Sequence, residues 1–176
     1  MGWWIVIGVI VVIALYLIVV YNRLVSLRQV VGQAWSDISV QLKQRHDLVP
    51  NLVETVKGYA AHERGTLEAV TNARTAAVAA NTPQATAAAE NTLTGALRPL
   101  FALSEAYPDL KASQNFLQLQ ADLSDLENKI AASRRFFNNA VQEYNSSTQQ
   151  FPAVLIAGPM GFTQREFFDL DEGERA

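Results

Sequence analysis

The sequence contains no cysteine, only two histidines and no run of basic residues. The lack of cysteine excludes disulfides and thiolate metal sites. The lack of a basic run argues against nucleic acid as a partner and against electrostatic docking on anionic lipid. Five acids and two bases in residues 163–176 account for the net charge of −3, and the other twelve acids and twelve bases balance.

Charge and proline are also absent from Trp3 to Tyr21, a run of nineteen residues. As a helix rising ~1.5 Å per residue, this run spans roughly 28 Å, which matches the hydrocarbon core of a bilayer. It lacks the basic start and small-residue cleavage site of a signal peptide, and Val6 does not fit a myristoylation motif beginning at Gly2. Residues 1–21 are therefore predicted to be a retained transmembrane anchor in the lipid bilayer.

The residues that flank this run predict its orientation. Trp3 and Trp4 lie at one end and Tyr21 at the other, as in the aromatic belts of membrane proteins. Arg23 and Arg28 follow Tyr21, and basic residues stay in the cytoplasm. We expect a single-pass protein with its N-terminus outside, its main domain in the cytoplasm, and a membrane interface formed by Trp3, Trp4, Tyr21 and Arg23.

Residues 22–150 show no strand-like alternation and are rich in residues that favour helices, which predicts an all-α domain. The anchor should continue past Tyr21 into a first long helix, with a kink but no break at Pro50 and an end near residues 58–62. Two shorter helices are expected over about 62–80 and 83–105. In the second of these, Thr82 would be the N-cap and Pro83 the first helical residue.

A fourth, long helix is predicted from a heptad seam of nine residues, Phe116, Leu119, Leu123, Leu126, Ile130, Ser133, Phe137, Ala140 and Tyr144. Short connections make neighbouring helices antiparallel, so two long and two shorter helices predict an antiparallel four-helix bundle. The shorter helices cannot cover the full length of the longer ones. The uncovered stalk should expose apolar residues for self-association into a homo-oligomer, namely Leu24, Val31, Trp35, Ile38, Phe136 and Val141.

Residues 151–176 form a tail that is apolar at first and acidic at its end. A long helix there is excluded by Pro152, Gly158, Pro159 and Gly161. Because the fourth helix returns toward the membrane, the tail is expected near the bilayer, with Leu155, Ile156 and Phe162 as further candidate contacts. It could pack on the stalk, on a neighbouring subunit or on lipid headgroups, or it could cap the open end of the bundle.

Residues suited to catalysis are scarce in this sequence. Neither His46 nor His62 belongs to an HExxH or Glu-x-x-His motif, and no phosphate-binding loop is present. His46 lies between Arg45 and Asp47 on an otherwise apolar helix face, which favours a satisfied polar cluster over an active site. We expect no catalytic residue, cofactor or metal site, and a hydrolase centred on His46 is the weakest hypothesis.

Four segments resemble those of the LemA family of bacterial membrane proteins: QLKQRHDLVPNLVETVKGYAAHE (41–63), VTNAR (70–74), EAYPDLKASQNFLQLQ (105–120) and ENKIAASRRFFNNAVQEYN (127–145). One departure is Phe136-Phe137, where the family more often has tyrosine. The resemblance implies a four-helix bundle on one transmembrane helix, in the bacterial cytoplasmic (inner) membrane. It implies no catalytic residue, because no activity is established for the family.

Two functional hypotheses follow. The first is a non-enzymatic, self-associating scaffold in envelope organisation or stress response. The alternative is an adaptor or accessory subunit of another membrane protein, such as a protease or a transporter. A discrete homo-oligomer would favour the first, and a stoichiometric foreign subunit would favour the second.

Overall fold

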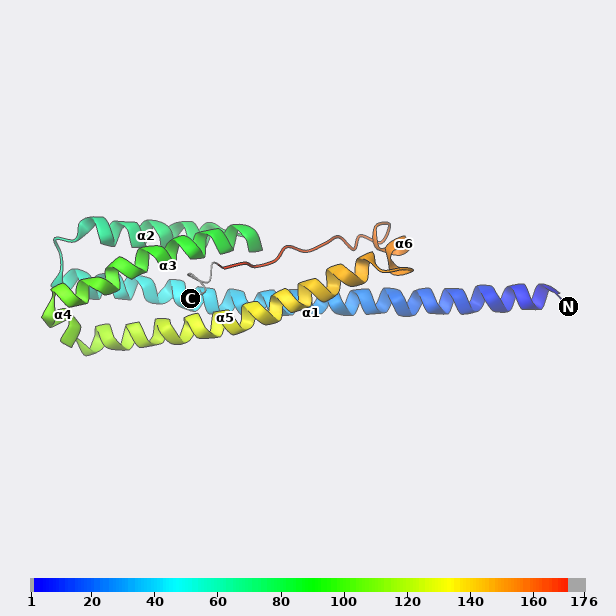
Figure 1. The fold of residues 1–176 in the computed structure, drawn as a ribbon, viewed down its shortest axis with the longest axis horizontal. Coiled ribbons are helices and arrows are strands. Elements are labelled where there is room, and N and C mark those ends of the chain that lie inside the picture. Colours follow the sequence, from blue (N-terminus) through cyan, green and yellow to red (C-terminus); the bar gives the residue numbers. More distant parts are fainter. Residues whose placement is uncertain (1, 171–176) are drawn as a thin grey trace, which may run out of the picture. The chain divides into compact units, whose positions relative to one another are not determined.

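The computed structural model describes residues 2–170. They form six helices in the order α1 Gly2–Tyr59, α2 Arg64–Ala79, α3 Pro83–Ala106, α4 Pro108–Ala112, α5 Gln114–Gln149 and α6 Ala153–Ala157 (Figure 1). No strand occurs among these residues, so the all-α prediction is confirmed. They pack as two compact units, one formed by residues 2–35 with 136–166 and the other by residues 36–135 with 167–170.

Helix α1 begins in the apolar run and continues without a break to Tyr59, with Pro50 inside it. This confirms that the apolar run extends into the first bundle helix. Within residues 2–170, α1 is the one helix long and apolar enough to cross a membrane, and none of its most apolar stretch is buried by the rest of the chain. An apolar helix that the protein leaves uncovered is suited to lie in lipid.

The unit of residues 36–135 is built around one hydrophobic core to which α1, α2, α3 and α5 all contribute. The core residues recur three or four positions apart along each helix, which puts them on one face. They are Val49, Leu52, Val56 and Ala60 of α1 and the following segment, Leu67, Val70, Ala73 and Ala77 of α2, Leu93, Leu97 and Leu100 of α3, Leu110 of α4, and Phe116, Leu119 and Leu123 of α5. The predicted bundle of two long and two shorter helices is thus confirmed, whereas the short α4 and α6 were not predicted.

The connection between α2 and α3 follows from local sequence. Thr82 is the N-cap of α3, and its hydroxyl oxygen accepts a hydrogen bond from the Ala85 amide at 3.2 Å. Pro83 follows as the first helical residue, where a missing N–H costs nothing. This confirms the predicted cap, and in Figure 1 the two helices run antiparallel on either side of it.

The unit of residues 2–35 and 136–166 joins the membrane-directed part of α1 to the end of α5 and to the tail. Trp35 and Phe137 stack with ring centroids 5.3 Å apart. The Asn145 side chain accepts a hydrogen bond from the Arg165 amide at 2.8 Å and donates one to the Arg165 carbonyl at 3.0 Å. The tail backbone is therefore tied to α5.

The predicted division into 1–21, 22–150 and 151–176 concerns placement in a membrane and stays a prediction. The two compact units follow packing and cut the chain elsewhere. The acidic end of the tail, residues 171–176, lies outside the described residues.

Candidate functional site

A buried polar cluster joins α1 to α3. Arg45 Nη1 of α1 donates a hydrogen bond to Glu90 Oε2 of α3 at 2.9 Å, and His46 Nε2 pairs with the other carboxylate oxygen, Oε1. The second arm of Arg45 donates from Nη2 to the Thr94 hydroxyl at 2.7 Å. Glu90 is fully buried, and Arg45 and His46 are nearly so.

The partners in this cluster satisfy one another. A buried carboxylate costs several kcal/mol in lost solvation unless it is paired and hydrogen-bonded. Each oxygen of Glu90 is paired with a side chain of α1, and Glu90 is not exposed to solvent. This geometry matches a structural clamp that fixes the register of α1 against α3.

A second contact compensates for the proline in α1. Pro50 has no N–H, so the carbonyl of His46, four residues earlier, loses its helical donor. Arg74 of α2 replaces that donor with its Nε atom, 2.7 Å from the His46 carbonyl oxygen. α2 thereby satisfies the backbone defect that Pro50 creates, which explains how α1 continues past it.

The sequence predicted a satisfied cluster around His46 but gave it one wrong partner. Asp47 is exposed and pairs instead with Lys43 at 3.2 Å. The true acidic partner, Glu90, was missed. Its signal was present, because Glu90 shares the apolar face of α3 with Ala87, Leu93 and Leu97 at helical spacing.

A hydrogen bond from the Tyr107 hydroxyl to Glu63 Oε1, 3.1 Å long, links the end of α3 to the residue before α2. This bond to a carboxylate, with smaller contributions from desolvation and from the nearby negative charge, raises the pKa of Tyr107 above its usual value of 10.0. The phenol therefore stays protonated at neutral pH and acts as a donor. Its role is to connect helix ends.

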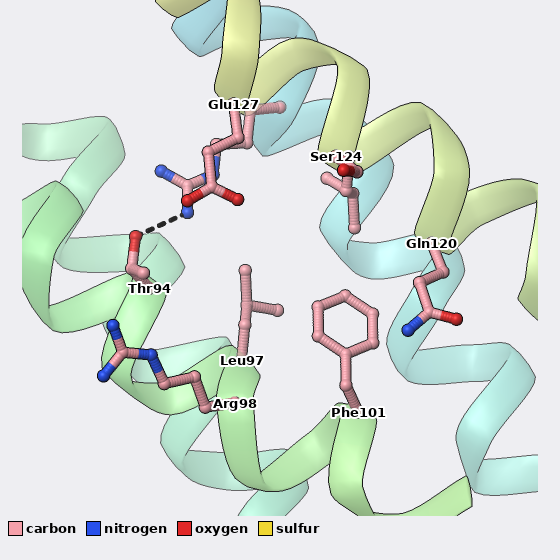
Figure 2. Close-up of a pocket in the computed structure, with 9 residues that line it drawn as sticks. Thr94, Leu97, Arg98, Phe101, Gln120, Ser124 and Glu127 are labelled. Carbon is pink, nitrogen blue, oxygen red and sulfur yellow. Dashed lines mark hydrogen bonds between the residues drawn. The ribbon is translucent and has the colours of Figure 1, made fainter. Parts of the chain in front are cut away.

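Next to the clamp, α3 and α5 border an open cleft of about 280 Å³ (Figure 2). Its lining comprises Arg45, Thr94, Leu97, Arg98, Phe101, Gln120, Leu123, Ser124 and Glu127. Leu97 and Phe101 form an apolar floor, while Gln120, Ser124 and Glu127 approach from α5. This lining contains neither histidine nor cysteine, so it offers no imidazole or thiolate for nucleophilic catalysis.

Metal chemistry finds no support in the described part of the chain. Within residues 2–170, no three His, Cys, Asp or Glu side chains come close enough together to hold an ion.

At the end of the apolar run, the tail returns to α1. The Phe162 ring meets Tyr21 edge to face with centroids 5.5 Å apart. The Arg28 guanidinium also lies over the Phe162 ring, 4.8 Å from its centroid. The expected return of the tail to the end of the apolar run thus has a specific contact.

The predicted contact residues divide into exposed and buried groups. The predicted membrane-interface residues Trp3, Trp4, Tyr21 and Arg23 are all exposed. Of the candidates for association, Phe136 and Leu155 are exposed, and Trp35 and Ile156 are half-buried. The others are buried within the chain: Leu24, Val31, Ile38, Val141 and Phe162.

Four of these side chains, Leu24, Val31, Ile38 and Val141, were expected to be exposed on the stalk, and that expectation was wrong because it treated the stalk as two bare helices. The expectation also ignored that apolar residues on one face of a long helix can be buried by other segments of the same chain. Phe162 packs on Tyr21 and Arg28, which agrees with packing on α1 as one of the alternatives for the tail. The candidates that are exposed, such as Phe136, remain available for a contact with another molecule, and that contact stays a prediction.

Comparison with known proteins finds one matching family and several relatives. The pattern of the LemA family matches residues 34–176. The chain is 28% identical to Protein LemA of Metamycoplasma hominis, over 88% of this chain and 71% of that protein. It is 24% identical to Magnetosome protein MamQ of Magnetospirillum gryphiswaldense and to Magnetosome protein MamQ 2 of Paramagnetospirillum magneticum, over 84% of this chain in each case.

The chain spans 64% of the length of these MamQ proteins, just under two thirds. None of these relatives carries the name of an enzyme. The family pattern covers the clamp, the cleft and the tail, together with most of the chain. The protein therefore belongs to the LemA family.

Proposed function

We propose that this protein is a membrane-anchored, non-enzymatic helical scaffold that associates with further copies of itself. It lies in the bacterial cytoplasmic membrane with its N-terminal end outside and its bundle in the cytoplasm. It serves envelope organisation or stress response. The observation that carries the proposal is the pairing of an uncovered apolar helix with a bundle whose buried charges are satisfied internally.

The clamp supports the non-enzymatic part of the proposal. A reaction centre needs polar groups that are free to meet a substrate. Here Glu90 is fully buried, and its two oxygens are held by Arg45 and His46. The two MamQ relatives are named for the magnetosome, a cellular structure rather than a reaction, which agrees with an organising role.

Self-association is supported by an aromatic side chain on α5. Phe136 is 59% exposed, although its neighbour Phe137 is buried against Trp35. Full burial of an exposed phenylalanine side chain under another surface contributes about 1.5–3 kcal/mol. A second copy of the chain, which presents the same residue, would provide that surface in a symmetric dimer.

The test is the mass of the protein extracted from its membrane in polymer-bounded lipid discs. The proposal expects a discrete homo-oligomer that becomes monomeric in Phe136→Asp. Leu117→Asp is the matched control, because Leu117 is also exposed on α5 but lies near its other end. This control should leave the oligomer unchanged.

Two other results are informative. A monomer in the unsubstituted protein would contradict the scaffold. A foreign subunit present in fixed proportion would favour the alternative role of adaptor for another membrane protein.

A further inference from the structure

The segment that contains α6 is built entirely of apolar, glycine and proline residues. From Phe151 to Phe162, no side chain carries a charge, a hydroxyl or an amide. Even so, Phe151 is 79% exposed, Leu155 63% and Met160 57%. Several large exposed apolar side chains within one short segment favour a contact with a protein or a membrane.

This segment has two distinct sides. Ala153, Ala157 and Phe162 are buried, so one side packs against the chain. Phe151, Leu155 and Met160, in contrast, are left uncovered by the packing within the chain. The exposed side is therefore available to an outside partner.

The contact with α1 fixes where that partner must lie. Phe162 packs on Tyr21, the last residue of the apolar run, and under Arg28. All of these residues belong to one compact unit. Figure 1 shows α6 and the turn after it alongside α1, with the N-terminal part of α1 extending beyond them. Since tyrosine and arginine at the end of a membrane span lie at the interface, the segment is held at that level.

Several backbone amides of the segment are hydrogen-bonded within the chain. This suits a poorly hydrated environment, in which unpaired amides are costly. The Val154, Leu155, Met160 and Phe162 amides donate to carbonyls of residues 150, 152, 156 and 157 at 2.8–3.0 Å. Pro152 and Pro159 have no N–H to satisfy. At these six positions, no backbone N–H would be left unpaired in lipid.

We propose that residues 151–162 form a second membrane contact, in which Phe151, Leu155 and Met160 insert into the interfacial lipid beside the anchor. This inference rests on the proposed anchoring of residues 3–21. Because the segment is uncharged, its binding comes from burial of apolar surface rather than from attraction to anionic headgroups. The bilayer is favoured over a second copy as the occupant because the segment lies next to the end of the apolar run.

The test uses nitroxide spin labels on the full-length chain in vesicles of equal parts phosphatidylcholine and phosphatidylglycerol. The sequence has no cysteine, so Leu155→Cys and Met160→Cys are labelled without background. Collision with oxygen reports lipid, and collision with a water-soluble nickel complex reports water. Val12→Cys in the apolar run is the lipid reference, and Val78→Cys, exposed on α2, is the water reference.

The expected result is an oxygen-to-nickel ratio at positions 155 and 160 that is several-fold above that at 78 and below that at 12, because position 12 lies at the middle of the apolar run and the segment lies at its end. A ratio equal to that at 78, with position 12 still in lipid, would overturn the second contact and leave the anchor intact. Low collision with both reagents, together with spin–spin broadening, would show a second copy as the occupant and would also overturn it. A water-like ratio at position 12 would overturn the anchoring itself, and this inference with it.

Discussion

Glu90 is the residue on which the buried polar cluster depends. Replacement of Glu90 by glutamine would keep the shape of the side chain but leave the Arg45 guanidinium buried without its counter-charge. Removing one partner of a buried ion pair costs about 3–5 kcal/mol. We expect Glu90→Gln to lower the free energy of unfolding by that amount, as measured by urea unfolding followed by circular dichroism.

The matched control is Glu105→Gln, which breaks an exposed ion pair with Lys111 and should cost less than about 1 kcal/mol. The double variant Arg45→Met, Glu90→Leu removes both buried charges and should be more stable than Glu90→Gln. Equal effects of Glu90→Gln and Glu105→Gln would show that the clamp does not hold α1 to α3.

At the scale of the helix, α3 contains a proline whose neighbour four residues earlier is Gly95. The missing side chain of a glycine at this position eases the bend that a proline imposes on a helix. A Cβ atom built on Gly95, however, meets nothing within 4 Å beyond its chain neighbours and the nearby backbone of its own helix. Glycine inside a helix costs roughly 0.5–1 kcal/mol relative to alanine. We therefore expect Gly95→Ala to stabilise the bundle by that amount in the same unfolding experiment.

The reverse substitution on the same helix, Ala102→Gly, provides the control. Ala102 is exposed in α3, so it should lose about as much stability as Gly95→Ala gains. A loss of stability in Gly95→Ala would mean that the bend at Pro99 does require glycine.

Helix periodicity and local capping were readable from the sequence because they depend on neighbours in the chain. The ends of α2 and α3 lie within about two residues of their predicted positions, and the Thr82 cap has its predicted geometry. The pairing of Arg45 with Glu90 joins residues 45 positions apart, and no local rule selects that partner. The contact of Phe162 with Tyr21 also joins residues far apart in the sequence, so packing of the tail on α1 was one of several alternatives that the sequence left open.

At the scale of the whole molecule, the charges beside the apolar run predict the orientation of the protein in the membrane. Arg23 and Arg28 follow the apolar run, and basic residues stay on the cytoplasmic side. Single cysteines in place of Gln29 and Val78 should therefore react with a membrane-impermeant maleimide only after cells are permeabilised. A cysteine in place of Gly2, on the other side of the run, should react in intact cells. Labelling of position 78 in intact cells would reverse the orientation.

The two hydrogen bonds between the Asn145 side chain and the backbone of Arg165 limit the substitutions that these positions tolerate. Asparagine offers one acceptor and one donor at this reach, and both meet main-chain atoms. Aspartate would lose the donor and place a negative charge against a carbonyl oxygen. Position 145 therefore favours asparagine, whereas this contact excludes only proline at position 165, because it uses the backbone N–H and C=O of that residue and not its side chain.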